Sequence, residues 1–125
     1  MVRQMPQLHT DSETLLYAYA QSVRDCAALQ LKSRDLTDGE VLIAAGIPWF
    51  MALFGRDSLI ASYQTLAFYP TAAKGVLRAL ARLQGVRRDP LRAEEPGKIL
   101  HEYRYRLLGG VQPGLPGYPY YGSID

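Results

Sequence analysis

Apolar residues recur three and four positions apart in three stretches of this chain, and this spacing is typical of helices that bury one face. The first stretch spans residues 11–31, where Asp11 or Ser12 is placed to accept hydrogen bonds from the free N–H groups of a helix start. Its apolar positions are Leu15, Leu16, Tyr19, Val23, Cys26, Ala27 and Leu29. The pattern predicts an amphipathic helix with one buried stripe.

Two further helices are predicted on either side of Pro70. Residues 58–68 have Leu59, Ile60, Tyr63, Leu66 and Ala67 at helical spacing. Asp57 is placed to accept at the start of this helix, which ends at Tyr69 because the residue before a proline avoids helical angles. Residues 71–84 follow, with Thr71 as a possible cap and Gly85 as a left-handed stop. The apolar face of this third helix comprises Val76, Leu77, Leu80, Ala81 and Leu83.

The segments between and after these helices contain turn-forming, charged or aromatic residues. Residues 32–46 indicate a turn followed by a short extended piece at Val41 and Ile43. Charge dominates residues 86–97, which predicts a long loop with one further helical turn at 98–106. Residues 109–122 hold five glycines and three prolines and predict an ordered aromatic loop. We therefore expect an all-α fold with long aromatic loops at one end.

Composition excludes several classes of protein. The 125 residues include 14 basic and 12 acidic side chains, which gives a net charge of +2. Because the two kinds are interspersed, the sequence has no basic stripe, and we expect no nucleic-acid partner. One cysteine and two histidines are too few for a disulfide or a structural zinc site, and we expect neither metal nor cofactor. Residues 41–55 form an apolar, uncharged stretch that is shorter than the roughly 20 apolar residues of a membrane span. Residues 1–12 lack a signal-peptide core, which favours a cytoplasmic location.

An aromatic block next to a charged pair is the first candidate for chemistry. Trp49, Phe50 and Phe54 precede Arg56 and Asp57 on a predicted loop that leads into a helix. Rings stack on the C–H face of a sugar, while charged groups make directional hydrogen bonds to its hydroxyls. The alternative is that the rings belong to the core and the charged pair caps the helix.

A second candidate lies in residues 94–102, where three carboxylates, Lys98 and His101 fall close together. Paired carboxylates serve as general acid and base when their surroundings separate their pKa values. A solvated surface loop is the alternative interpretation. Tyr118, Tyr120 and Tyr121 either form another wall of a carbohydrate cleft or pack a loop against the helices.

Taken together, four blocks of the chain resemble one family. The blocks are AGIPWFMALFGRDSLIASYQTL at 45–66, GVLRALARLQG at 75–85, EEPGKILHEYR at 94–104 and PYYGSID at 119–125. In this order they resemble bacterial amylo-α-1,6-glucosidases, the glucosidase part of glycogen debranching enzymes. The resemblance covers most of the chain from about residue 12 onward.

The resemblance implies an (α/α)6 toroid of alternating inner and outer helices, with a sugar cleft built by loops at one end. It implies inverting hydrolysis of α-1,6-linked glucose at the branch points of glycogen or starch, so the expected partner is an oligosaccharide or branched α-glucan. In related toroidal glycosidases an Arg-Asp pair grips the outer sugar hydroxyls, which matches Arg56 and Asp57. The substrate-binding residues expected by this resemblance are Trp49, Phe50, Arg56, Asp57, Glu95, Lys98, His101, Glu102, Tyr121 and Asp125.

Three or four helices would form only the opening part of such a toroid, so residues 1–125 are expected to be an N-terminal fragment of the catalytic domain. The general acid and base of the family lie on later loops, one with a Trp-Lys-Asp-Ser type motif that this sequence lacks. The chain is therefore expected to need the rest of that domain and to be inactive alone. The alternatives are a non-catalytic carbohydrate-binding module and a helical interaction protein.

Overall fold

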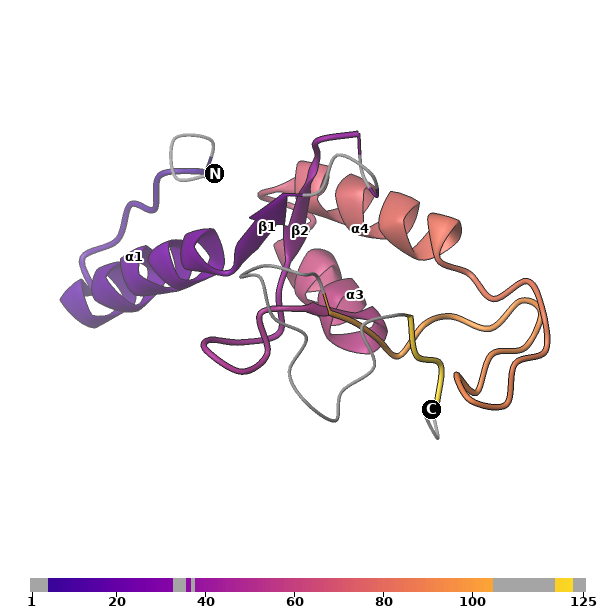
Figure 1. Cartoon of the computed structure of the whole chain (residues 1–125). Coiled ribbons are helices and arrows are strands. Elements are labelled where there is room, and N and C mark those ends of the chain that lie inside the picture. Colours follow the sequence, from indigo (N-terminus) through magenta and orange to yellow (C-terminus); the bar gives the residue numbers. More distant parts are fainter. Residues whose placement is uncertain (1–4, 33–35, 37, 105–118, 123–125) are drawn as a thin grey trace.

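The computed structural model describes residues 5–32, 36, 38–104 and 119–122, and its first element is helix α1 (Glu13–Ala28). Ser12, one of the two candidate caps, caps the helix by accepting a hydrogen bond from the backbone N–H of Leu15 at 3.3 Å. In Figure 1, α1 extends to one side of the other helices. Val23 is its buried residue, whereas Leu15 and Leu16 are exposed. The predicted helix is confirmed, but most of its apolar stripe is not covered by the described residues.

A hairpin follows α1 and lies between it and the remaining helices (Figure 1). Strand β1 (Gln30–Lys32) pairs antiparallel with β2 (Val41–Ile43), and Leu31 lies opposite Leu42. The extended piece expected at Val41 and Ile43 is confirmed. The sequence pattern placed β1 partly inside the first helix, because Leu31 continues the apolar spacing of that helix into the strand.

Helices α3 (Gly55–Thr65) and α4 (Pro70–Arg82) pack against each other and against β2. Pro70 is the first residue of α4, so the expected cap at Thr71 is wrong; proline suits this position because its missing N–H has no helical partner there. Val76 and Leu80 are buried as predicted, while Leu77 is exposed. A Cβ at Gly75 would collide with the carbonyl oxygen of Val41, so glycine allows α4 to approach β2 closely.

Helix α3 buries a different face from the one predicted from its apolar residues. Its buried residues are small, namely Gly55, Ser58 and Ser62. The Ser58 hydroxyl donates to the carbonyl oxygen of Ile43 at 2.9 Å, which satisfies this buried polar group. The predicted apolar face instead points outward, with Tyr63 80% exposed. The small side chains face the interior because they allow the helix to lie close to β2.

A second small sheet joins the region after the hairpin to the C-terminal part of the chain. Strand β3 (Leu53–Phe54) pairs antiparallel with β4 (Glu102–Tyr103), and Tyr120 forms a further bridge with Glu102. The helical turn predicted at 98–106 is therefore wrong over its described part, because pairing with β3 holds residues 102–103 extended; residues 105–106 lie outside the described residues. Most of the predicted aromatic loop also lies outside them, with only residues 119–122 described.

The expectation of an all-α fold, and with it the partial (α/α)6 toroid, is wrong. Two antiparallel sheets stand among the helices and contribute to the core, so the described residues form a mixed α/β arrangement. The core contains Leu31, Leu36, Leu42, Ala44, Leu53, Val76, Ala79, Leu80, Leu100 and Tyr121. The sequence pattern predicted the extended piece of β2 but missed strands β1, β3 and β4. In the described part of the chain, the helices are too short or too polar to cross a bilayer.

Candidate functional site

A cavity of about 440 Å³ lies beside the first turns of α3. It is lined by Arg56, Leu59, Ile60, Lys98, Ile99, Leu100, His101 and Tyr121, and we call it the α3 cavity. Its walls come from α3, from residues 98–101, which lead into β4, and from Tyr121. The size is that of a small-molecule site, since such sites span about 300–1,000 Å³.

The start of α3 is held directly against the segment that forms the opposite wall. The backbone N–H of Gly55 donates to the carbonyl oxygen of His101 at 3.0 Å. A Cβ on Gly55 would collide with the carbonyl oxygen of Leu100. Glycine at this position therefore sets the spacing between Arg56, the next residue of α3, and His101.

Lys98 is fixed by the loop that precedes it. Its Nζ donates to the carbonyl oxygen of Ala93 at 3.0 Å, and its own carbonyl oxygen accepts from the N–H of Gly85 at 2.9 Å. The left-handed stop expected at Gly85 is wrong, because the left-handed glycine here is Gly97, with φ of 85°. Gly85 is required for a different reason, since a Cβ there would collide with the carbonyl oxygen of Glu95.

Tyr121 lines the cavity and is only 3% exposed. Its hydroxyl donates to the carbonyl oxygen of Leu83 at 2.7 Å, and the guanidinium carbon of Arg92 lies 5.7 Å from the ring centroid. Burial, assisted by the negative charge of Glu94, raises the pKa of the Tyr121 phenol. Tyr121 is thus a neutral, hydrogen-bonded part of the wall.

His101 belongs to a row of rings that connects the cavity to the loop of the predicted aromatic block. Ring centroids lie 6.0 Å apart for Phe50 and Phe54, 5.8 Å for Phe54 and His101, and 6.3 Å for His101 and Tyr120, all edge to face. Arg104 Nη1 also donates to the carbonyl oxygen of Trp49 at 2.8 Å. The aromatic loop and the cavity are therefore parts of one connected surface.

Three of the nearby carboxylates lie outside the lining of the cavity. Glu94 is buried and accepts from the N–H of Val86 at 3.0 Å, with Arg92 Nη1 3.4 Å from its Oε2. The Val86 hydrogen bond, followed by the charge of Arg92, lowers the pKa of Glu94. Glu102 forms an ion pair with Arg104, and Glu95 is exposed. The described structure thus gives Glu94 and Glu102 ionic partners within the protein.

The structure brings four of the ten predicted site residues into the lining of one cavity: Arg56, Lys98, His101 and Tyr121. Trp49, 66% exposed, and Phe50 lie on the neighbouring loop instead. Outside the lining are also Asp57, exposed in the first turn of α3, and the carboxylates Glu95 and Glu102. Asp125 lies outside the described residues.

The sequence analysis missed the apolar lining of the cavity, which is Leu59, Ile60, Ile99 and Leu100. Leu59 and Ile60 follow Arg56 by three and four positions, and this spacing places them on the same helix face. The apolar spacing that includes Leu59 and Ile60 is visible in the sequence, but it predicts a buried helix face and not the wall of a cavity.

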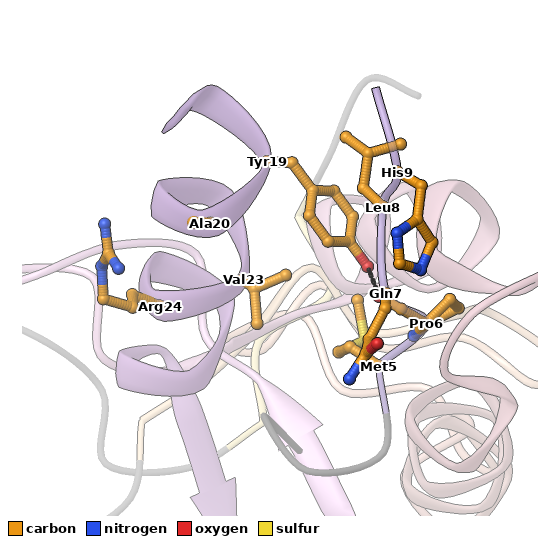
Figure 2. Close-up of a pocket in the computed structure, with 9 residues that line it drawn as sticks. All are labelled: Met5, Pro6, Gln7, Leu8, His9, Tyr19, Ala20, Val23 and Arg24. Atoms are coloured by element: carbon orange, nitrogen blue, oxygen red, sulfur yellow. Dashed lines mark hydrogen bonds between the residues drawn. The ribbon is translucent and has the colours of Figure 1, made fainter. Parts of the chain in front are cut away.

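A second cavity, of about 400 Å³, lies between α1 and the segment before it. Figure 2 shows Tyr19 and Val23 projecting from α1 toward residues 5–9. The Tyr19 hydroxyl donates to the carbonyl oxygen of Pro6 at 2.6 Å and so ties this segment to the helix. None of the predicted site residues lines this cavity, so the α3 cavity is the stronger candidate.

Within the described ranges, no group of three or more His, Cys, Asp and Glu residues is arranged to hold a metal ion. Comparison with known proteins identifies no relative, since no family model and no curated protein matches the chain.

Proposed function

We propose that this chain forms a sugar-holding part of a glycoside hydrolase of the amylo-α-1,6-glucosidase type, which cleaves α-1,6-linked glucose at branch points of glycogen or starch with inversion. The main support is that Arg56, Lys98 and Tyr121 come from three separate blocks of the resemblance and line one cavity. Residues far apart in sequence meet there at a site of small-molecule size. A cytoplasmic location is part of the same proposal.

The lining suits the two faces of a glucose ring. Arg56 and Lys98 supply N–H donors for sugar oxygens, while the side chains of Leu59 and Ile99 offer apolar contact to C–H groups. In this proposal the cavity orients the glucosyl unit and transfers no proton, so its contribution to the reaction is positioning.

Inverting hydrolysis needs two carboxyl groups, roughly 6.5–9.5 Å apart, one to protonate the leaving oxygen and one to activate water. The described residues that line the α3 cavity include no acid. We therefore propose that both carboxyl groups come from the remainder of the catalytic domain, which is the partner of this chain. The chain by itself then binds sugar without hydrolysing it.

Calorimetric titration of isomaltose, two glucose units in α-1,6 linkage, into the full chain tests this proposal. We expect saturable binding that Arg56→Ala abolishes and that Arg88→Ala, at an exposed arginine outside the lining, retains. Circular dichroism of both variants checks that they are folded. Absence of isomaltose binding by the folded wild-type chain would refute the proposal, and glucose release by the chain alone would refute its positioning role.

A second candidate function, that of a helical interaction protein, is supported by the outward face of α3. Ile60 and Tyr63 on this helix and Leu66 at its C-cap are all exposed. Contiguous apolar surface of this kind marks sites of protein association. Sedimentation velocity over a range of concentrations, with and without isomaltose, separates the two functions: association without sugar binding supports the second.

A further inference from the structure

We infer that Arg104 is a positioning residue of the candidate site. Its guanidinium holds the loop of residues 46–50, which we call the Trp49 loop, so that Trp49 and Phe50 are in place before a sugar binds. The ligand in this inference rests on the proposed function, whereas the role of Arg104 toward the loop rests on its own contacts. Arg104 is not among the ten predicted site residues.

The Trp49 loop is closed at its base and presents large apolar side chains to solvent. The backbone N–H of Gly46 donates to the carbonyl oxygen of Phe50 at 3.0 Å, and the N–H of Phe50 donates to the carbonyl oxygen of Gly46 at 3.1 Å. Ile47, Trp49 and Phe50 are each more than half exposed. Adjacent exposed apolar side chains of this size mark a contact surface.

Arg104 holds the tip of this loop from another part of the fold. Its Nη1 donates to the carbonyl oxygen of Trp49 at 2.8 Å, across 55 positions of the sequence. Within the described ranges, no other side chain makes a hydrogen bond to residues 47–49. Because the hydrogen bonds between Gly46 and Phe50 fix only the base of the loop, the position of Trp49 depends on Arg104.

The guanidinium of Arg104 is itself fixed from two further sides. It forms an ion pair with Glu102, and its central carbon lies 6.0 Å from the ring centroid of Phe54, which is a cation–π distance. The Arg104 side chain is only 21% exposed. A planar guanidinium with five N–H donors serves several partners at once, whereas the ammonium of lysine is a compact point charge. Arg104 therefore anchors the Trp49 loop to the sheet of β3 and β4.

The same sheet connects the loop to the α3 cavity. The Phe54 ring lies 6.0 Å from the ring of Phe50 and 5.8 Å from that of His101, which lines the cavity. Aromatic rings offer an apolar face to the C–H groups of a sugar. A side chain that is held before binding loses less freedom when the ligand arrives, so holding Trp49 in place favours affinity.

The test uses the fluorescence of Trp49, which is the only tryptophan of the chain and needs no label. Time-resolved anisotropy of the full chain separates fast motion of the indole from tumbling of the whole molecule. Arg104→Met removes the charge and the donors, and we expect it to increase the amplitude of the fast component. In calorimetric titrations with isomaltose, the affinity should fall about three- to tenfold, the cost of ordering a further side chain on binding.

Arg104→Lys separates positioning from stability. It keeps a positive charge beside Glu102, so we expect it to restore the melting temperature more fully than it restores the anisotropy and the isomaltose affinity. Full recovery of all three by lysine would overturn the role given to the guanidinium. Arg88→Met, at an exposed arginine without a contact to the Trp49 loop, is the matched control and should behave like the wild type in all three measurements.

Two further outcomes would overturn the inference and leave the proposed function standing. One is an anisotropy decay of Trp49 that is unchanged in both folded Arg104 variants. The other is faster motion of Trp49 with the isomaltose affinity of the wild type, which would remove the loop from the sugar site. Absence of isomaltose binding by the folded wild-type chain would refute the proposed function, while the anisotropy comparison would still decide whether Arg104 holds the loop.

Discussion

Gly55 lies against Leu100 so closely that a Cβ at this glycine would collide with the Leu100 carbonyl oxygen. This contact, together with the hydrogen bond from Gly55 to His101, locks the first turn of α3 to the opposite wall of the α3 cavity. The packing of one glycine thus sets the width of the candidate site.

Gly55→Ala is expected to destabilise the protein by about 1–3 kcal/mol, the usual cost of overpacking a tight site. Displacement of the Leu100 backbone also moves Lys98 and His101, so ligand affinity falls as well. Urea unfolding measures the first effect and calorimetry the second. Gly46→Ala is the matched control, because its Cβ would lie at an ordinary distance of 3.7 Å from the Phe50 Cβ. Equal losses in the two variants would contradict the role given to Gly55.

Tyr121→Phe removes the donor to the Leu83 carbonyl while keeping the buried ring. This hydrogen bond is part-buried, so its loss costs about 0.5–1.5 kcal/mol, and the free energy of unfolding in urea titrations is expected to fall by this amount. Tyr63→Phe, at a residue 80% exposed, makes the same chemical change at the surface and should alter stability by less than about 0.5 kcal/mol. A Tyr121→Phe variant as stable as the Tyr63→Phe control would be incompatible with the hydrogen bond.

The lowered pKa of Glu94 predicts that the folded state becomes less stable in acid. Its folded-state pKa is lowered, first by the Val86 N–H, so the unfolded chain binds the proton more readily. The stabilisation is therefore complete above the ordinary value of about 4.3 and is lost as the pH falls through the lower folded pKa. Glu94→Gln is expected to lower stability at pH 7 and to flatten this part of the pH profile, measured by thermal melting between pH 2 and pH 7 (about the range of carboxyl titration).

The matched control for this experiment is Glu95→Gln, which removes the same charge from the exposed neighbouring residue. It should keep the neutral-pH stability of the wild type. A Glu94→Gln variant that keeps the acid profile of the wild type would rule out this contribution.

Tyr63→Lys combined with Leu66→Lys is expected to reduce concentration-dependent self-association of the chain. Tyr63 on α3 and Leu66, which caps the end of this helix, are both exposed, and their apolar surface favours contact with another molecule. The double variant should keep its melting temperature within a few degrees, about the shift that 0.5 kcal/mol causes. Sedimentation velocity measures the association, and Ala79→Lys, at a buried residue of α4, is the contrasting variant that should unfold. Unchanged association of the double variant would show that this face is not the contact.

The local elements of this protein were predictable because their signals lie within a few residues. The apolar repeat and Ser12 locate α1, and the repeat that includes Val76 and Leu80 locates α4. The short extended piece at Val41 and Ile43 follows from β-branched residues after a turn. Four residues of the cavity were also among the expected site residues. The chemistry of a charged pair beside aromatic rings indicated Arg56, whereas Lys98 was expected to bind sugar only from the family resemblance.

By itself, then, the sequence determined where helices form and which residue types are able to hold a ligand. Only the tertiary structure decided that α3 buries Ser58 and Ser62 instead of Ile60 and Tyr63, and that residues 102–103 form a strand. The physical reason is that both outcomes depend on distant partners. Because α3 lies close to β2, only small side chains fit between them. Strand β3 supplies the backbone groups that hold β4 extended. The spacing of residue types along the chain does not show that β2 lies close to α3 or that β3 lies next to β4.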